Sequence, residues 1–366
     1  MLKHSNILPR SKPDRVPRVR DRAVKLRNVA ILVTAFSALA TVQMFAQVSP
    51  QAPGTKPSAA APSSQPNRPV TISPISEIKK MVAFLTVTYQ TPKGILQRRG
   101  TSFFVAYEDK RLGTGQAFIY LVTNRHMAEP GFEDGSSFPV INFSLKINKR
   151  SLDGTSTAFE ASLPVTMSGN HWYFRDDDPS VDLAVLPFAP DQATYDYSAF
   201  PTSLMATRDI VQSQSIAEGD SVVFAGFFYQ FSGLKKNEPI VREGVLAMMP
   251  EEKMTTTMHK PGDLYLADVH VFNGNSGSPM FVNVGGMRNG SISIGGFPFR
   301  LLGVVSGYMN ESEKFEIEVS PTLPESSKEN SGISTVVPVD GLKDLLDSAP
   351  LQQIRDAVVA SMPVHQ

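Results

Sequence analysis

Three segments of this sequence carry side chains that together could perform one reaction. His126 ends the apolar segment Tyr120-Leu-Val-Thr-Asn-Arg-His126, and an imidazole can accept and return a proton near neutral pH. Asp182 stands within the apolar run 181–188, and Ser276 lies between two glycines in Gly274-Asn-Ser-Gly277. A general base, an orienting carboxylate and a hydroxyl nucleophile are the parts needed for acyl transfer through a covalent intermediate.

Each of these signals is weak when taken alone. A single histidine at a strand end is more often an ordinary residue, and Asp182 could cap its strand and stay solvated. A Gly-x-Ser-Gly turn arises by chance in roughly one chain of this length in ten. The prediction therefore depends on the combination, in which 56 residues separate His126 from Asp182 and 94 separate Asp182 from Ser276. Hydrolases of other folds place these groups in other chain orders.

The surroundings of Asp182 strengthen the case for a fixed partner. On a strand of period two, Ala184 and Leu186 share its face, while Val181 and Leu183 lie on the other. Because both faces are apolar, an unpaired carboxylate would be costly to bury. An imidazole N–H would satisfy it.

The elements that must position these groups are predicted to be short strands. From residue 75 onward, apolar runs alternate with turns rich in Gly, Pro, Asn and Asp, which favours an all-β sandwich or barrel. A helical pattern appears only at 339–347 and 351–362. The predicted strands are 81–89, 101–107, 117–123, 140–147, 159–167, 181–188, 221–227, 244–249, 265–271, 280–284, 291–294, 301–305 and 333–337.

Composition excludes several classes of function. The 366 residues include no cysteine, so a disulfide, a thiolate nucleophile and a Cys-ligated metal site are all excluded. Lys plus Arg and Asp plus Glu each number 35, but residues 1–28 hold 9 basic and 2 acidic side chains. The rest is mildly acidic, which argues against nucleic acid as a partner.

The first 74 residues have the composition of a targeting segment and a tether. The basic stretch 1–28 precedes residues 29–46, which are apolar and carry no charge. We expect a signal peptide cleaved after Ala40 or Ala46, or an uncleaved membrane anchor. Residues 47–74, rich in Pro, Ala and Ser, form an extended linker. The protein is thus expected outside the cytoplasmic membrane, as a periplasmic, secreted or membrane-anchored protein.

Seven motifs together give the sequence a family resemblance. It resembles the trypsin-like serine peptidases of the bacterial, disulfide-free kind, and is similar to the protease domains of the HtrA and glutamyl endopeptidase groups. The motifs span about 240 residues. They are Gly100-Thr-Ser-Phe-Phe-Val105, Thr123-Asn-Arg-His126, Val181-Asp-Leu-Ala-Val-Leu186, Glu218-Gly-Asp-Ser-Val-Val223, Gly274-Asn-Ser-Gly-Ser-Pro279, Leu302-Gly-Val-Val-Ser-Gly307 and Ile333-Ser-Thr-Val-Val-Pro338.

The resemblance implies a chymotrypsin-like double β-barrel within a peptidase domain at 75–345. Barrel one would cover about 78–190 and barrel two about 205–310, with the cleft between them, and 346–366 would be a C-terminal helix and tail. The implied reaction is hydrolysis of a peptide bond in a peptide or protein substrate, with no metal and no organic cofactor.

The resemblance also implies roles for individual residues. Ser276 would be the nucleophile, His126 the general base and then acid, and Asp182 the group that orients His126. The backbone N–H groups of Gly274 and Ser276 would form the oxyanion hole. The substrate-binding residues would be Ser306, Gly307 and Tyr308, as the edge that pairs with an extended substrate, and His270, at the base of the primary specificity pocket.

Other interpretations remain open at this stage. Asn275 stands where digestive members carry an aspartate, so activation by cleavage of the N-terminus is not expected.

A catalytically silent or weak member of the same fold could act as a peptide- or protein-binding module. An unrelated β-sandwich adhesin would require the three motifs to coincide by chance.

Overall fold

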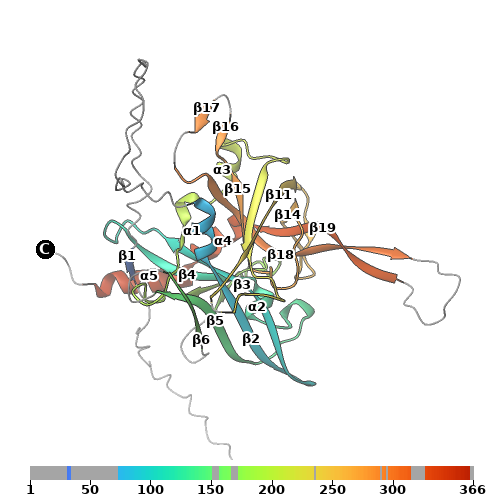
Figure 1. Ribbon diagram of the computed structural model, residues 1–366, viewed down its shortest axis with the longest axis horizontal. Coiled ribbons are helices and arrows are strands. Elements are labelled where there is room, and N and C mark those ends of the chain that lie inside the picture. The colour runs from blue at the N-terminus through green and yellow to red at the C-terminus, as the bar shows by residue number, and fades with distance from the viewer. Residues whose placement is uncertain are drawn as a thin grey trace, which may run out of the picture.

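A computed structural model of the protein describes residues 31–33, 73–150, 156–165, 172–234, 236–288, 291–293, 296–314 and 326–362. Strands dominate, and two helices end the described chain (Figure 1). This confirms the predicted all-β class with a short C-terminal helical segment. The predicted signal or anchor segment lies outside the described residues except for 31–33, and so does the linker except for 73–74. None of the helices in the described ranges is long and apolar enough to cross a membrane.

The elements follow one another with short connections. The strands are β1 (Ile31–Val33), β2 (Val82–Thr91), β3 (Gly94–Tyr107), β4 (Gln116–Thr123), β5 (Val140–Arg150), β6 (Ser156–Val165), β7 (Tyr173–Phe174), β8 (Ala184–Pro187), β9 (Phe200–Pro201), β10 (Ser221–Gly226), β11 (Ile240–Met248), β12 (Met254–Thr255), β13 (Pro261–Gly262), β14 (Tyr265–Asp268), β15 (Pro279–Asn283), β16 (Gly286–Arg288), β17 (Ser291–Ser293), β18 (Phe299–Lys314) and β19 (Ser326–Pro338). The helices are α1 (Pro74–Met81), α2 (Arg125–Ala128), η1 (Phe132–Asp134), η2 (Thr202–Leu204), α3 (Arg208–Ser213), α4 (Val339–Leu346) and α5 (Ala349–Ser361).

The first half of the globular chain forms one sheet in the order β6-β5-β2-β3-β4-β8-β7, with β1 on β4 and β9 on β3. The sequence of strand β3 is apolar on both faces because each face packs into a different core. Phe103 and Val105 point into the core shared with the second half, whereas Phe104 and Ala106 point into the core of the first. Since alternate residues of a strand face opposite sides, two cores require an unbroken apolar run.

The second half forms a closed barrel in the order β10-β11-β14-β19-β18-β15. It reaches Pro338 and so extends beyond the limit of about 310 expected from the sequence, because β19 is the strand that joins β14 to β18. Closure leaves the barrel without unpaired edges over the joined segments. The far ends of β18 and β19 continue as a two-stranded arm that leaves the body (Figure 1).

Aromatic contacts join the two halves along their seam. The rings of Phe84 and Phe227 meet edge to face at 5.0 Å, and those of Phe200 and Phe281 lie 5.1 Å apart. All of these except Phe84 are completely buried, and burying one such ring contributes roughly 1.5–3 kcal/mol. The seam is thus a packed core that holds both halves in fixed relation.

The helices correct one prediction, because helical structure is not confined to the C-terminus. Helix α1 begins with Pro74, a residue well suited to a first helical position, and buries Ile78 and Met81. It is too short for its periodicity to be distinguished from that of the strand that follows. At the other end, Arg355 of α5 donates to the hydroxyl of Tyr120 at 3.0 Å and to the carbonyl of Leu346, which fastens the C-terminus to β4.

Candidate active site

His126 lies in a one-turn helix that follows its strand, and not at the end of the strand itself. Strand β4 ends at Thr123, and α2 begins at Arg125. The Arg125 side chain is buried, with its guanidinium 3.6 Å from the ring centre of Phe132 and 4.5 Å from that of Phe174. These stacked contacts anchor the helix and thereby fix the backbone from which the imidazole projects.

Asp182 also differs from the sequence prediction, because it precedes its strand instead of lying within it. Strand β8 begins at Ala184. Before it the chain makes a tight turn, with the N–H of Leu183 donating to the carbonyl of Val181 at 2.9 Å. The side chain of Asn124 donates to the carbonyl of Asp182 at 2.9 Å. The turn and this hydrogen bond bring the carboxylate to α2.

The two side chains are joined directly. His126 Nδ1 lies 2.7 Å from Asp182 Oδ2, and the His126 backbone N–H donates to Oδ1 at 3.0 Å. A third donor, the hydroxyl of Thr257, reaches Oδ2 at 2.7 Å. Asp182 has no exposed side-chain surface, while His126 keeps 15%. The imidazole is therefore held on its Nδ1 side and accessible on the other.

These contacts determine the ionisation of the carboxyl group. Burial raises the pKa of Asp182, but the charge of His126 and the hydrogen bonds from His126 and Thr257 lower it more. The net result is a pKa below the ordinary value, so Asp182 is ionised near neutral pH. An ionised carboxylate at this position can stabilise a positive charge on His126.

We expect Asp182→Asn to flatten the acid dependence of folding stability. Because the pKa of Asp182 is lowered in the folded chain from 3.8, its carboxylate adds stability above that value, and the addition is lost as pH falls through the folded pKa. The variant lacks this contribution at every pH. Urea unfolding between about pH 6 and pH 3 should show a shallower decline for the variant than for the wild type. Asp268→Asn, at an exposed position, serves as the control, and equal declines in Asp182→Asn and the wild type would contradict the expectation.

The loop that carries Ser276 is fastened to the first half of the chain by Thr101. The Thr101 N–H donates to the Ser276 carbonyl at 2.8 Å, and its hydroxyl donates to the Gly274 carbonyl at 2.7 Å. Gly277 has φ +85°, and a Cβ there would lie 2.0 Å from the Thr101 carbonyl oxygen. The glycine thus makes this close approach possible, and the loop sits against β3 beside the end of β4.

Asn275 shapes the same loop without any charged partner. Its side chain is completely buried, accepts from the N–H of Phe272 at 2.8 Å and donates to the carbonyl of Phe227 at 3.0 Å. The amide oxygen is thus used inside the loop, and the amide nitrogen ties the loop to the chain that follows β10. The loop conformation depends on these neutral hydrogen bonds.

The predicted oxyanion donors are left unused by the fold. Within the described residues, neither the N–H of Gly274 nor that of Ser276 donates to any acceptor. Gly274 is buried with φ +99°. Because buried N–H groups are almost always paired, two free ones on one turn are available to an incoming oxygen atom.

The hydroxyl of Ser276 has a different partner in this structure from the one expected in the reaction. It donates to the carbonyl of Ser306 at 3.4 Å, and within the described chain it makes no hydrogen bond with His126. Such contacts are commonly long in unliganded sites and shorten when substrate binds. The pair of predicted site residues that is already hydrogen-bonded is His126 with Asp182.

The predicted substrate edge lies on β18. Strand β18 pairs with β15 only as far as Val304, whereas its pairing with β19 continues past Gly307 and Tyr308. Over Gly307 and Tyr308, β18 therefore has no second strand partner in the described part of the chain. Ser306 is buried, and Tyr308 is 36% exposed. An extended segment could pair with this free side.

His270 lies between Phe272 and the chain segment around Gly332. It is exposed, its ring stacks with that of Phe272 at 6.5 Å, and a Cβ on Gly332 would touch it at 3.0 Å. The structure therefore places His270 beside β19.

Two residues at the site have no role in the sequence prediction. Thr101 lies in a motif that the resemblance covers, but only the structure shows its hydrogen bonds to the Ser276 loop. Thr257 lies in the run Thr255-Thr-Thr257, which has no periodicity or spacing that points to Asp182. Neither residue carries a sequence signal that could have identified it.

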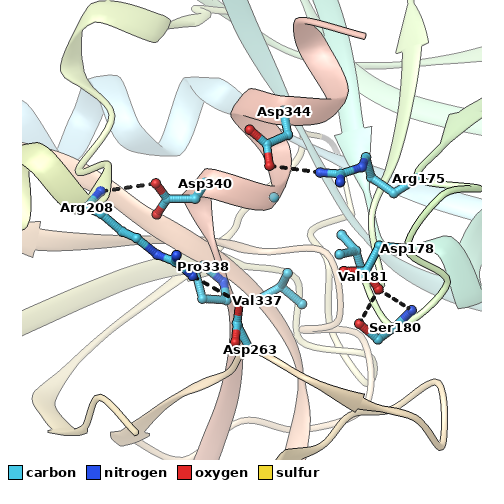
Figure 2. Close-up of a pocket in the computed structure, with 11 residues that line it drawn as sticks. Arg175, Asp178, Ser180, Val181, Arg208, Asp263, Val337, Pro338, Asp340 and Asp344 are labelled. Atoms are coloured by element: carbon cyan, nitrogen blue, oxygen red, sulfur yellow. Dashed lines mark hydrogen bonds and ion pairs between the residues drawn. The ribbon is translucent and has the colours of Figure 1, made fainter. Parts of the chain in front are cut away.

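A separate hollow of about 320 Å³ lies between the chain preceding Asp182 and helix α4 (Figure 2). Its two arginines are paired with aspartates that also line it, Arg175 with Asp344 at 2.9 Å and Arg208 with Asp263 at 3.0 Å. Neither His126 nor Ser276 lines it. Among the described residues, no group of three or more potential metal-ligating side chains comes together.

Comparison with known proteins identifies a family for this chain. The model of the family described as "Trypsin-like peptidase domain" matches residues 100–287. No curated protein matches the sequence. The chain is similar to the crystal structure of Deg5, with 15% identity, a TM-score of 0.40 and coverage of 74% of this chain and 88% of the other. It is also similar to the HtrA-type protease AlgW with decapeptide, with 16% identity, a TM-score of 0.40 and coverage of 77% and 66%.

Proposed function

We propose that this chain, which belongs to the trypsin-like peptidase family, is an exported serine endopeptidase that forms an acyl-enzyme on Ser276. The observation that carries the proposal is the hydrogen bond of 2.7 Å between His126 Nδ1 and a fully buried, ionised Asp182. A buried carboxylate that holds an accessible imidazole fits a general base.

The proposed mechanism uses each group in turn. His126 takes the proton of the Ser276 hydroxyl as the oxygen attacks the carbonyl carbon of the scissile bond, and Asp182 stabilises the imidazolium that results. The free N–H groups of Gly274 and Ser276 bind the oxygen of the tetrahedral intermediate. His126 then gives its proton to the leaving amine, and water releases the acyl group by the same route.

The substrates of this reaction are peptides or proteins in extended form. A segment that adds to the free side of β18 at Gly307 and Tyr308 would bring its carbonyl groups to Ser276 in regular register. His270, which lies beside Gly332 of β19, is proposed to contact a substrate side chain.

A peptide-library digest with the purified protein tests the activity. We expect cleavage that disappears in Ser276→Ala, with cut sites that define the substrate preference. If the folded protein binds peptides but cleaves none, the catalytically silent binding module becomes the better description. Retained cleavage in Ser276→Ala would contradict the assignment of the nucleophile.

Export is supported by the basic stretch 1–28 followed by the uncharged residues 29–46. We expect an epitope tag inserted after Pro69 to be reached by antibody in cells whose cytoplasmic membrane is intact but whose outer layers are opened. A tag in a cytoplasmic protein of the same cells is the control. Detection of the Pro69 tag only after lysis of the cytoplasmic membrane would remove the export claim.

A further inference from the structure

The carboxylate of Asp182 is held by a residue that lies 75 positions further along the chain. Thr257 Oγ1 donates to Oδ2 at 2.7 Å, the oxygen that also faces His126 Nδ1. Thr257 belongs to the loop between β12 and β13 and thus comes from the second half of the chain, whereas His126 and Asp182 come from the first. One oxygen atom is thus shared by donors from both sides of the seam.

Two glycines allow this loop to come so close. A Cβ on Gly262 would lie 2.7 Å from Ser180 Oγ, and a Cβ on Gly307 would lie 3.2 Å from the γ-methyl of Thr257. The loop is also fixed internally, since Met258 is buried and its N–H donates to the hydroxyl of Thr256 at 3.2 Å. The fixed backbone of this loop therefore holds the side chain of Thr257 next to Asp182.

The other hydroxyl on this side of the site is already engaged. Ser306 is buried, and its Oγ lies 3.1 Å from Thr335 Oγ1. Within the described residues, Thr257 is thus the hydroxyl that contacts the carboxylate. Because a buried carboxylate needs several donors, loss of this contact leaves one oxygen with His126 alone.

We propose that Thr257 is a positioning residue for the His126–Asp182 pair. The proposal rests on the function proposed above. The backbone N–H of His126 fixes Oδ1, and Thr257 fixes Oδ2, so the plane of the carboxylate cannot rotate. A fixed plane holds the Nδ1 proton of His126 in line with Oδ2 and directs the opposite ring nitrogen toward the proton of Ser276.

The test replaces the hydroxyl by a methyl group of similar size. A fluorophosphonate probe that phosphonylates Ser276 gives the maximal labelling rate and the probe concentration at half that rate, without any need for the natural substrate. We expect Thr257→Val to lower the maximal rate roughly 10- to 100-fold, the effect of one hydrogen bond to a charged group. The half-saturating concentration should not change, and Thr257→Ser should restore most of the rate.

Two controls separate positioning from a general effect on folding. Thr255→Val makes the same change at an exposed position two residues away and should label at the wild-type rate. The proton resonance of His126 Nδ1 should shift or broaden in Thr257→Val but not in Thr255→Val. If Thr257→Val does not fold, Thr257→Ala carries the same expectation, because it removes the hydroxyl without adding bulk.

The outcomes distinguish this proposal from the proposed function. If wild-type protein is labelled and Thr257→Val reaches the same maximal rate, Thr257 has no positioning role although the enzyme assignment stands. A change confined to the half-saturating concentration would also overturn the proposal, because it would place Thr257 in ligand binding. Absence of labelling in the folded wild type would instead refute the proposed function.

Discussion

Replacement of His126 by alanine is expected to slow phosphonylation of Ser276 by about 10⁶-fold, as loss of the general base does in other serine hydrolases. Without the imidazole nothing removes the proton of the Ser276 hydroxyl, whose only partner in the described chain is the carbonyl of Ser306. The rate of labelling by a fluorophosphonate, followed over hours for the variant, measures the effect.

His259 provides a matched control for this substitution. It is an exposed histidine, 68% accessible, whereas His126 is half-buried, and its imidazole lies 3.7 Å from Asp134. His259→Ala should label at the wild-type rate. A similar loss in both variants, or a His126→Ala variant that reacts as fast as the wild type, would show that His126 is not the base.

A second large effect is expected from Gly274→Ala. Gly274 has φ +99°, and a Cβ there would lie 2.8 Å from the Phe227 carbonyl oxygen and 3.2 Å from the Tyr229 nitrogen. The backbone must shift to relieve this contact, and the N–H of Gly274 then leaves its position in the proposed oxyanion hole. We expect the turnover number on a peptide substrate to fall by about 10²–10³-fold, the usual cost of one such donor.

The variant Gly219→Ala distinguishes loss of the Gly274 N–H donor from the strain that an alanine causes at a positive φ. The φ of Gly219 is +91°, and an added Cβ would meet nothing within 4 Å. Gly219→Ala therefore carries a comparable conformational cost, roughly 1–2 kcal/mol of stability, but should keep wild-type turnover. An unchanged turnover number in Gly274→Ala would remove Gly274 from the oxyanion hole.

The fold was largely predictable because its strands carry regular signals. The run 117–123 appears as β4 with one residue added at its start, and the run 101–107 forms the second half of β3, which begins at Gly94. Both runs were recognisable because unbroken apolar runs mark strands that are buried on both faces. The ends are less well determined. Asp182 was expected inside a strand, but the strand begins at Ala184 because the preceding residues turn toward α2.

The site residues were predictable only where the local sequence contains an unusual residue type or spacing. A carboxylate among apolar residues indicates that Asp182 needs a partner, and the glycines beside Ser276 indicate a tight turn. Thr101 and Thr257 show no such local signal, because both act through hydrogen bonds to a distant segment of the chain. A threonine is common, and its partner depends on how two halves of the chain pack together.

The most direct measurement is mass-spectrometric mapping of fluorophosphonate label on the folded wild-type protein. We expect about one label per chain, located on Ser276 and absent from Ser276→Ala, because the His126–Asp182 pair activates that hydroxyl alone. Stoichiometric label on another residue, or no label on protein that unfolds cooperatively, would contradict the central claim.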